Sequence, residues 1–332
     1  MIHPIPPGTR DVLPEEMREL RRLHGNLIET FERFGYGEVA TPAIEYDEVL
    51  GRGDGRTAAS AYRFFDESGE LLALRSDMTV PIARLVASRY AKAEMPLRLC
   101  YLASAFRAVR PQRGPMREFT QAGGELIGAP APAGTAEVVK VLEATLDAAG
   151  LDRAVIGLGD ADLYRQLLAE LGVEGAARDS LLERLAMHDL VGLEAELSEV
   201  AGISDEQCAT CVALTQLRGG SEVLGQAREL GGPAVERATA RIQETFEALQ
   251  EHGVADRVQI DLGLLSDLGY YSGAILEVYD PALGHVLGGG GRYDELLKRF
   301  GVDQPAAGFA LYLERVHVAQ MEEESRRQEE AS

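Results

Sequence analysis

The chain has 332 residues, of which 45% are hydrophobic and 26% are charged, and its formal net charge at pH 7 is -21. This composition can bury a sizeable core, which excludes a disordered chain, and no run approaches the roughly 18 uncharged apolar residues that a membrane span needs. The acidic excess opposes contact with a phosphate backbone, so the surface as a whole is not that of a nucleic-acid-binding protein.

The first part of the chain predicts one long helix and several short strands. The helix extends from Pro14 to residue 35, because proline and acids occupy its first turn and apolar residues follow at helical spacing. Short strands are predicted at 38–40 and 71–75. Residues 76–81 then predict a helix start, since Ser, Asp and Thr there offer capping oxygens. A strand that leads into a capped helix is a common place for site residues.

A long antiparallel hairpin is predicted between residues 97–106 and 118–127. Its loop carries four arginines in eleven residues, which indicates an anion-facing turn. On the returning strand, Gln121 and Glu125 share one face with a glycine between them, which makes a polar floor with room above it. If that face met solvent, both would be ordinary surface residues, and the hairpin alone leaves the two interpretations open.

The middle of the chain predicts a helix at 135–149, a short strand at 154–158 and an all-helical stretch at 178–250. That stretch has apolar residues at helical intervals, with glycine pairs as breaks. Nothing in it has the spacing of a catalytic motif.

Strands return after residue 258, where an alternating apolar run leads into the adjacent pair Tyr270 and Tyr271. If the pair continues the strand, only one tyrosine can face a given pocket, and the pair is either core packing or the wall of a ligand site.

Four glycines at 288–291 match no phosphate-loop pattern but permit close approach of a ligand. A helix is predicted from residue 295 to 300, a strand-to-helix segment at 308–316, and a charged, frayed tail from 322. The element order predicts an α+β fold with a mixed or antiparallel sheet.

The three cysteines cannot form a closed disulfide framework, which fits a reducing compartment. Cys208 and Cys211 match a C-x-x-C pattern, but no second pair of cysteines or histidines lies at suitable spacing. We therefore expect no metal site and two ordinary cysteines on one helix. Because the N-terminus lacks a basic and then apolar stretch, we also expect a cytoplasmic protein.

In this order, the segments resemble the catalytic domain of class II aminoacyl-tRNA synthetases, and within that class the histidine-tRNA ligase, over nearly the whole chain. Segments similar to the three class II motifs are GYGEVATPAIE at 35–45, the stretch 106–125 and AAGFALYLER at 306–315. Segments similar to the lining of the histidine pocket are LRSDMT at 74–79, LGYY at 268–271 and GGGRYD at 289–294. Each is modest alone, but six in order with compatible spacing are specific. The likeness implies a mostly antiparallel sheet flanked by helices, and dimerisation through the first motif.

The resemblance also implies a histidine-binding pocket. Asp77 would meet the ammonium group of the ligand, with Thr79 beside it, and Gln121 would contact the amino-acid backbone. Glu125 and Tyr271 would contact the imidazole, because a carboxylate and a phenol can satisfy both ring nitrogens. Capping of a helix by Asp77 and Thr79 is compatible with these roles. The positions that match the family's pocket are Asp77, Thr79, Gln121, Glu125, Tyr270 and Tyr271.

Several departures from the ligase count against adenylation. Ser266 stands where the ligase has an arginine that stabilises charge at the reacting groups, and loss of such a cation typically costs ~10²-fold or more in rate. In the third motif, Tyr312 replaces a glycine that makes room for the nucleotide. The second motif loses a glutamate, an arginine and an aromatic residue, whose positions hold Val109, Pro115 and Met116. Residual anion-binding positions are Arg107, Arg110 and Arg315. We therefore predict a retained amino-acid site, a damaged nucleotide site and no catalytic residue.

The resemblance divides the chain into a core of residues 1–177 and 251–317, a helical insertion at 178–250 and an acidic tail at 318–332. Only about seventeen residues follow Arg315, so we expect no anticodon-binding domain, which in the ligase has about a hundred residues. The acidic charge and this ending both predict that tRNA is not a partner.

This combination is similar to a paralogous family, the ATP phosphoribosyltransferase regulatory subunits. Membership would imply a non-catalytic subunit, without cofactor, that forms a hetero-oligomer, expected to be a hetero-octamer, with the short form of ATP phosphoribosyltransferase. It would activate that enzyme and transmit feedback inhibition by L-histidine in the first step of histidine biosynthesis. The alternatives are a truncated histidine-activating ligase and a scaffold with a vestigial pocket. Whether histidine acts through the pocket or at a subunit interface stays open.

Overall fold

The computed structural model describes residues 5–53, 60–108, 116–265, 269–281 and 283–330. Ser266, Val109, Arg110 and Pro115, which the sequence singled out, lie outside these ranges. None of the helices in the described ranges combines the length and apolar composition that a membrane span needs.

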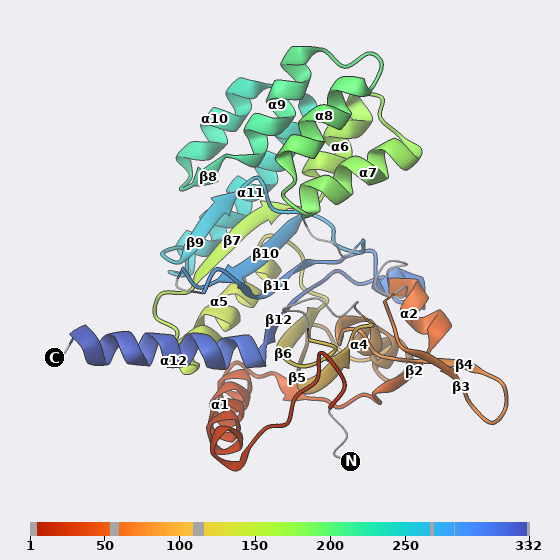
Figure 1. The fold of residues 1–332 in the computed structure, drawn as a ribbon, viewed down its shortest axis with the longest axis vertical. Helices are drawn as coiled ribbons and strands as arrows, with labels where there is room; N and C mark the ends of the chain where they lie inside the picture. Colours follow the sequence, from red (N-terminus) through yellow and green to blue (C-terminus); the bar gives the residue numbers. More distant parts are fainter. Residues whose placement is uncertain (1–4, 54–59, 109–115, 266–268, 282, 331–332) are drawn as a thin grey trace.

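A nine-stranded sheet forms the centre of the described structure (Figure 1). Seven of its strands come from the two ends of the chain, and two pairs of neighbours, β1 with β5 and β7 with β9, are parallel. All other neighbours are antiparallel, which confirms the predicted α+β class. In spatial order the strands are β1 (Gly37–Glu38), β5 (Leu97–Phe106), β6 (Glu118–Ile127), β12 (Ala306–Tyr312), β11 (Val286–Arg292), β10 (Ala274–Tyr279), β7 (Val155–Asp160), β9 (Val258–Asp261) and β8 (Arg218–Gly219).

Three long helices pack together on one face of the sheet. They are α1 (Pro14–Arg33), α5 (Ala133–Ala148) and α11 (Pro233–Glu251). In α1 the buried side chains Leu20, Leu23, Leu27 and Phe31 recur at intervals of three and four, so a single apolar stripe meets the sheet. The predicted helix at 135–149 corresponds to α5.

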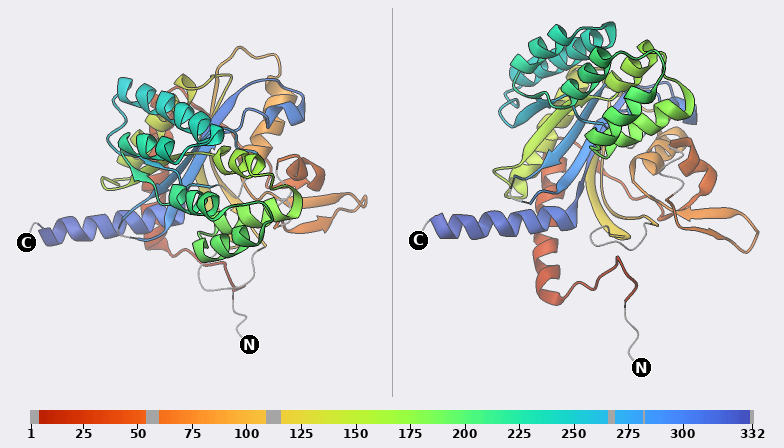
Figure 2. Two further views of the ribbon diagram at one scale, coloured as in Figure 1. Left: turned by 90° about the horizontal axis from the view of Figure 1, so that it is seen from above. Right: turned by 45° about the horizontal axis from the view of Figure 1, so that its top comes forward.

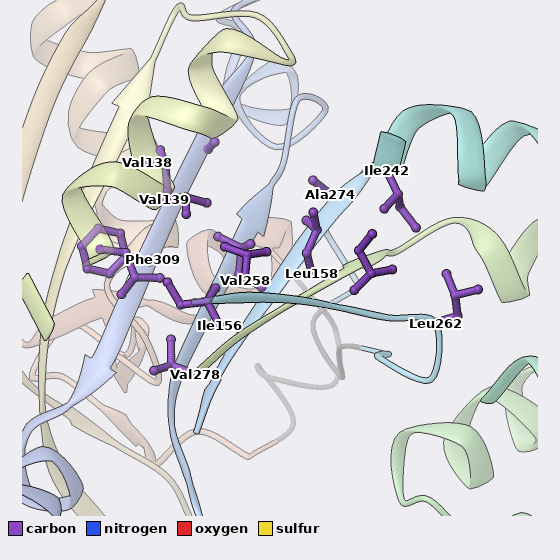
Figure 3. Close-up of a cluster of buried hydrophobic side chains, with 14 of the residues drawn as sticks. Val138, Val139, Ile156, Leu158, Ile242, Val258, Leu262, Ala274, Val278 and Phe309 are labelled. Carbon is purple, nitrogen blue, oxygen red and sulfur yellow. The ribbon is translucent and has the colours of Figure 1, made fainter. Parts of the chain in front are cut away.

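The main core lies between this helical layer and the sheet. Figure 3 shows side chains from α5, α11 and the strands β7, β10 and β12 meeting there. The side chains labelled in that view include Val138, Ile242, Ile156, Leu158, Val278 and Phe309. Because strand residues alternate between faces, the residues between these core positions point to the opposite face of the sheet.

The opposite face is covered near one end by smaller elements. They are α2 (Asp47–Gly53), α4 (Thr79–Leu85), the π-helical turn η1 (Val86–Tyr90) and the 3-10 turn η2 (Leu297–Phe300). A small antiparallel sheet of β2 (Ile44–Tyr46), β4 (Leu71–Leu74) and β3 (Arg63–Phe65) projects beside them, as Figure 1 shows. The strand β4 leads directly toward α4, as the sequence predicted.

Shorter helices gather at the far end of the sheet, next to β7 to β9 (Figures 1 and 2). They are α6 (Leu163–Glu170), α7 (Gly175–Ala186), α8 (Leu190–Glu199), α9 (Asp205–Thr215) and α10 (Glu222–Leu230). The stretch 178–250 is not entirely helical, because β8 within it joins the edge of the main sheet against β9. Its treatment as a separate insertion stays a prediction.

Three other local predictions were wrong. The strand from residue 258 ends at Asp261, because the Asp261 carboxylate accepts a hydrogen bond from the Gly263 amide at 2.9 Å and turns the chain. The helix expected at 295–300 is the shorter η2. The tail is helical rather than frayed, since α12 (Leu313–Glu330) continues through it and buried Glu323 accepts hydrogen bonds from the amides of Asp152 and Arg153.

Candidate functional site

A cavity of about 970 Å³ opens on the face of the sheet opposite α5. Its floor is formed by β6, β10, β11 and β12, and its walls by the start of α4 and the tyrosines before β10. Side chains of α7 line another part of it. Among the predicted site residues, those that line the cavity are Asp77, Thr79, Arg107, Gln121, Tyr270 and Tyr271. The fold therefore brings six predicted positions from four separate segments to one cavity of a size suited to a small molecule.

Asp77 and Thr79 lie where β4 turns into α4. The Asp77 Oδ1 atom accepts a hydrogen bond from the Val80 amide at 3.0 Å, so this carboxylate does cap the helix. Thr79 Oγ1 points inward and donates to Glu125 Oε1 at 2.9 Å. Only 4% of Asp77 is exposed, and it lies at the cavity wall. Its capping role thus places a buried carboxylate beside the cavity.

Gln121 lies in the floor, on β6, which is the outermost of the four floor strands. It is 4% exposed, and its Oε1 atom has no hydrogen-bond partner among the described residues. A buried amide oxygen without a partner costs free energy, which a ligand N–H group would recover. Of the two interpretations that the hairpin left open, the burial of Gln121 and Glu125 favours a floor over an exposed surface.

Glu125 lies behind the cavity wall rather than in it. Its carboxyl group accepts hydrogen bonds from Thr79, from Tyr101 at 3.5 Å and from Tyr293. Burial raises the pKa of Glu125 to about 8, although the hydrogen bonds from Tyr293 and Thr79 act in the opposite direction. In this arrangement Glu125 orients side chains that line the cavity, and its direct contact with an imidazole stays a prediction.

Both adjacent tyrosines line the cavity, so the prediction that only one could do so was wrong. It assumed a continuous strand, whereas Tyr270 and Tyr271 stand in the irregular segment before β10. Their ring centroids are 5.0 Å apart, and Tyr293 completes the cluster at 6.0 Å and 6.5 Å from them. The cluster forms one aromatic wall with several hydroxyl groups.

The sequence missed Tyr293 and Tyr101 as individual site residues. Tyr293 belongs to the segment at 289–294 that resembles the pocket lining, so its hydroxyl could have been proposed. Tyr101 faces Gly123 in the register of β5 and β6, which places it on the same face as Gln121 and Glu125. Only the register of the hairpin could have identified it.

Arg107 is the only arginine or lysine that lines the cavity within the described ranges. Its guanidinium carbon lies 4.9 Å from the centroid of the Phe119 ring. Arg315 does not line the cavity, because its Nη1 atom donates to the Val286 carbonyl at 2.6 Å and its guanidinium covers the Tyr312 ring. Arg110 lies outside the described residues. Anion binding by these residues stays a prediction.

Acidic side chains line the part of the cavity near α7. They are Asp179 and Glu183 of α7 and Glu277 of β10. Burial raises the pKa of Glu277, while His188 lowers it. This acidic part of the cavity is unfavourable for a polyphosphate.

The described residues contain no cluster of three or more histidine, cysteine or acidic side chains that could hold a metal ion. Cys208 and Cys211 are buried free thiols on α9, and burial raises the pKa of Cys211 to about 11. Their surroundings are those of core residues.

The comparison with known proteins agrees with the geometry. The family model for histidyl-tRNA synthetase matches residues 8–316. The ATP phosphoribosyltransferase regulatory subunit of Moorella thermoacetica is 41% identical over 320 residues, which are 96% of this chain and 82% of that protein. The chain belongs to the ATP phosphoribosyltransferase regulatory subunit family. A second member, from Desulforamulus reducens, is 41% identical and is matched over 78% of its length.

A solved structure shows the same fold for this family. The protein described as an ATP phosphoribosyltransferase regulatory subunit/histidyl-tRNA synthetase from Bacillus halodurans C superposes with a TM-score of 0.85 at 32% identity, and the match covers 96% of this chain and 84% of that one. The predicted class II synthetase-like fold and the predicted family are both confirmed. The roles of the individual site residues are not tested by these likenesses.

Proposed function

We propose that this protein is the histidine-sensing regulatory subunit of a short-form ATP phosphoribosyltransferase. It assembles with the catalytic subunit in the cytoplasm as a hetero-oligomer, expected to be a hetero-octamer built on dimers of this chain. It raises the activity of the catalytic subunit and lowers it again when L-histidine occupies the cavity. Family membership supports the regulatory role, and the cavity supports the choice of ligand.

The observation that carries the choice of ligand is that buried Asp77 in the wall and buried Gln121 in the floor line the same cavity. A carboxylate and an unpartnered amide oxygen together suit an ammonium group, because both accept hydrogen bonds and one carries a negative charge. Arg107, the arginine that lines the cavity in the described part of the chain, supplies a cation for a carboxylate. An α-amino acid carries these two charged groups.

The imidazole side chain would meet the wall formed by Thr79 and the tyrosine cluster. Hydroxyl groups can donate to one ring nitrogen and accept from the other, so they suit an imidazole better than an aliphatic side chain. Glu125 anchors this wall through Thr79 and Tyr293. The proposal therefore assigns Glu125 to positioning the hydroxyl groups as well as to reading the imidazole.

Isothermal titration calorimetry with L-histidine tests the ligand. We expect Gln121→Ala to weaken binding about tenfold or more, since a hydrogen bond to a charged group contributes about 1.5–3 kcal/mol. Gln250→Ala, on the exposed end of α11, is the matched control and should bind as the wild type does. Absence of a binding signal in the wild type, or equal binding by Gln121→Ala, contradicts the proposal.

A histidine-dependent ATP–pyrophosphate exchange assay tests the alternative of a truncated ligase. We expect no exchange, because Ser266 and Tyr312 replace residues that the ligase chemistry needs and acidic side chains line the cavity. Exchange at rates typical of a synthetase would establish an enzyme instead. A scaffold with a vestigial pocket would show neither exchange nor histidine binding.

A further inference from the structure

The segment that carries Tyr271 to the cavity is held by hydrogen bonds from other parts of the chain. The Ser272 amide donates to the Arg292 carbonyl at 2.8 Å, and the Asp294 amide donates to Ser272 Oγ at 3.0 Å. These two contacts join the segment to the end of β11. Because an irregular segment has no sheet ladder of its own, contacts of this kind determine where its side chains lie.

The turn between β7 and α6, at the far end of the sheet in Figure 1, also holds this segment. The Ala161 amide donates to the Gly273 carbonyl at 2.7 Å. Gly273 has a φ of +72°, which glycine adopts without steric cost, so the chain can turn here from the tyrosines into β10. Four residues after Ala161, the Nη1 atom of Arg165 donates to the Tyr271 carbonyl at 3.1 Å. Arg165 thus contacts the backbone of a residue whose ring lines the cavity.

The side chain of Arg165 is itself oriented by its surroundings. Its Nη1 atom lies 3.7 Å from Asp162 Oδ1, an i, i+3 ion pair at the start of α6. This end of α6 is anchored because the carboxylate of Asp160 accepts a hydrogen bond from the Asp162 amide at 3.0 Å and two from Arg241 of α11 at 2.8 Å. Asp160 is 2% exposed. The guanidinium group of Arg165 therefore extends from a base that buried, charge-assisted hydrogen bonds stabilise.

Arg165 does not line the cavity, and neither does any other residue of α6, all of which the structure describes. Its influence on a ligand must therefore pass through Tyr271. The Tyr271 ring lies close over the floor, because a Cβ atom on Gly291 of β11 would stand 3.1 Å from Tyr271 Cδ1. A displacement of the Tyr271 backbone would move the ring and its hydroxyl group across this floor.

We propose that Arg165 is a positioning residue for the ligand, because its hydrogen bond to the Tyr271 carbonyl fixes the direction in which the Tyr271 hydroxyl enters the cavity. The identity of the ligand rests on the proposed function, whereas the positioning of the segment rests on the backbone contacts. A hydrogen bond weakens steeply as its geometry departs from the preferred angle. A small displacement of the Tyr271 backbone therefore weakens binding although every lining residue is still present.

Three variants separate positioning from general packing of α6. Arg165→Ala removes the donor to Tyr271. Arg165→Lys retains a positively charged donor on a long side chain, and one ammonium group can replace the single contacting nitrogen of the guanidinium. Arg237→Ala is the matched control, because Arg237 anchors α6 from the side of α11, through Gln166 and Glu170 at 2.8 Å each. Thermal melting verifies the fold of each variant.

Calorimetry with L-histidine gives the first readout. We expect Arg165→Ala to weaken binding about fivefold or more, and Arg165→Lys and Arg237→Ala to stay within about twofold of the wild type. The double variant Arg165→Ala/Tyr271→Phe tests the route, because loss of the guanidinium should weaken binding less when the hydroxyl is already absent. The proposal is overturned by unchanged affinity of Arg165→Ala, by an equal loss in Arg237→Ala, or by the same effect of Arg165→Ala in both backgrounds.

Hydrogen–deuterium exchange without histidine gives a second readout that does not depend on the ligand. We expect the amides of residues 270–273 to exchange about fivefold faster or more in Arg165→Ala than in the wild type, Arg165→Lys and Arg237→Ala. Equal exchange in the four proteins also overturns the proposal. If the wild type fails to bind histidine, the proposed ligand is wrong, while the exchange comparison still decides whether Arg165 positions the segment.

Discussion

Asp77 combines a structural role with a proposed ligand-binding role in a single side chain. Its carboxylate caps α4 through the Val80 amide, and the same buried group lies at the wall of the cavity. Sequence patterns identified both possibilities, because a strand followed by capping residues predicts the helix start and the family likeness predicts the ligand role. At the residue scale, the two roles can be separated by substitution.

Asp77→Asn should separate them. Asparagine is as good a helix cap as aspartate, so the melting temperature should change little. The negative charge that we propose to contact the ammonium group of histidine is lost, and we expect histidine affinity to fall about 10- to 100-fold. Calorimetry and thermal melting on one preparation verify this. A large loss of stability with unchanged affinity would assign Asp77 to capping alone.

The raised pKa of Glu125 predicts how the free energy of unfolding depends on pH. Its pKa rises from 4.5 in the reference state to about 8 in the folded protein, so the folded state binds more protons between these values. The contribution of this group to stability is therefore fully present below about pH 4.5 and is lost as the pH rises toward 8. The glutamine side chain in the variant Glu125→Gln cannot titrate. This substitution should therefore remove the fall in the free energy of unfolding with rising pH that Glu125 causes.

Urea unfolding of the wild type and Glu125→Gln at pH 5, 6, 7 and 8 measures the effect. The free energy of unfolding of the wild type should fall relative to that of Glu125→Gln at each step. Glu229→Gln, at an exposed position of α10, is the control and should track the wild type. If the free energy of unfolding changed with pH by the same amount in the wild type and in Glu125→Gln, the result would contradict the raised pKa of Glu125.

At the element scale, the cavity depends on close packing between β6, β12 and β11. Gly308 of β12 pairs with Glu125 of β6, and a Cβ atom at Gly308 would collide with the Glu125 carboxyl group and approach the Gly124 carbonyl at 2.7 Å. The strands and the bounds of the hairpin could be predicted from alternation and turn signals. Their register could not, because it depends on cross-strand packing that a single sequence does not display, and the role of Tyr101 was missed for that reason.

Gly308→Ala should therefore destabilise the protein by about 1–3 kcal/mol, as overpacking of a close-packed interior does. Gly225→Ala on α10 is the matched control. Its Cβ would meet open space, and alanine is the better helix former, so stability should stay equal or rise slightly. Chemical denaturation of both variants provides the comparison. Equal stability of Gly308→Ala and wild type would show that the strands can separate at no cost.

At the scale of the whole molecule, the cavity unites segments from both ends of the chain with a helix from its middle. The family motifs predicted the contributions of α4, β6 and the tyrosine segment, because their residue types carry recognisable chemistry. The contribution of α7 could not be predicted, since its Asp179 and Glu183 are ordinary surface residues in a helical pattern. Only the tertiary packing places them at the cavity.

We propose that histidine acts on the catalytic subunit through this cavity. The most direct measurement is the steady-state turnover of a purified short-form ATP phosphoribosyltransferase, alone and with this chain, over a range of L-histidine concentrations. We predict that the wild-type chain raises turnover and confers inhibition by histidine, and that the Asp77→Asn chain raises turnover equally but needs at least tenfold more histidine for half-inhibition. A chain that leaves turnover unchanged, or inhibition at the same histidine concentration with both chains, would contradict the claim.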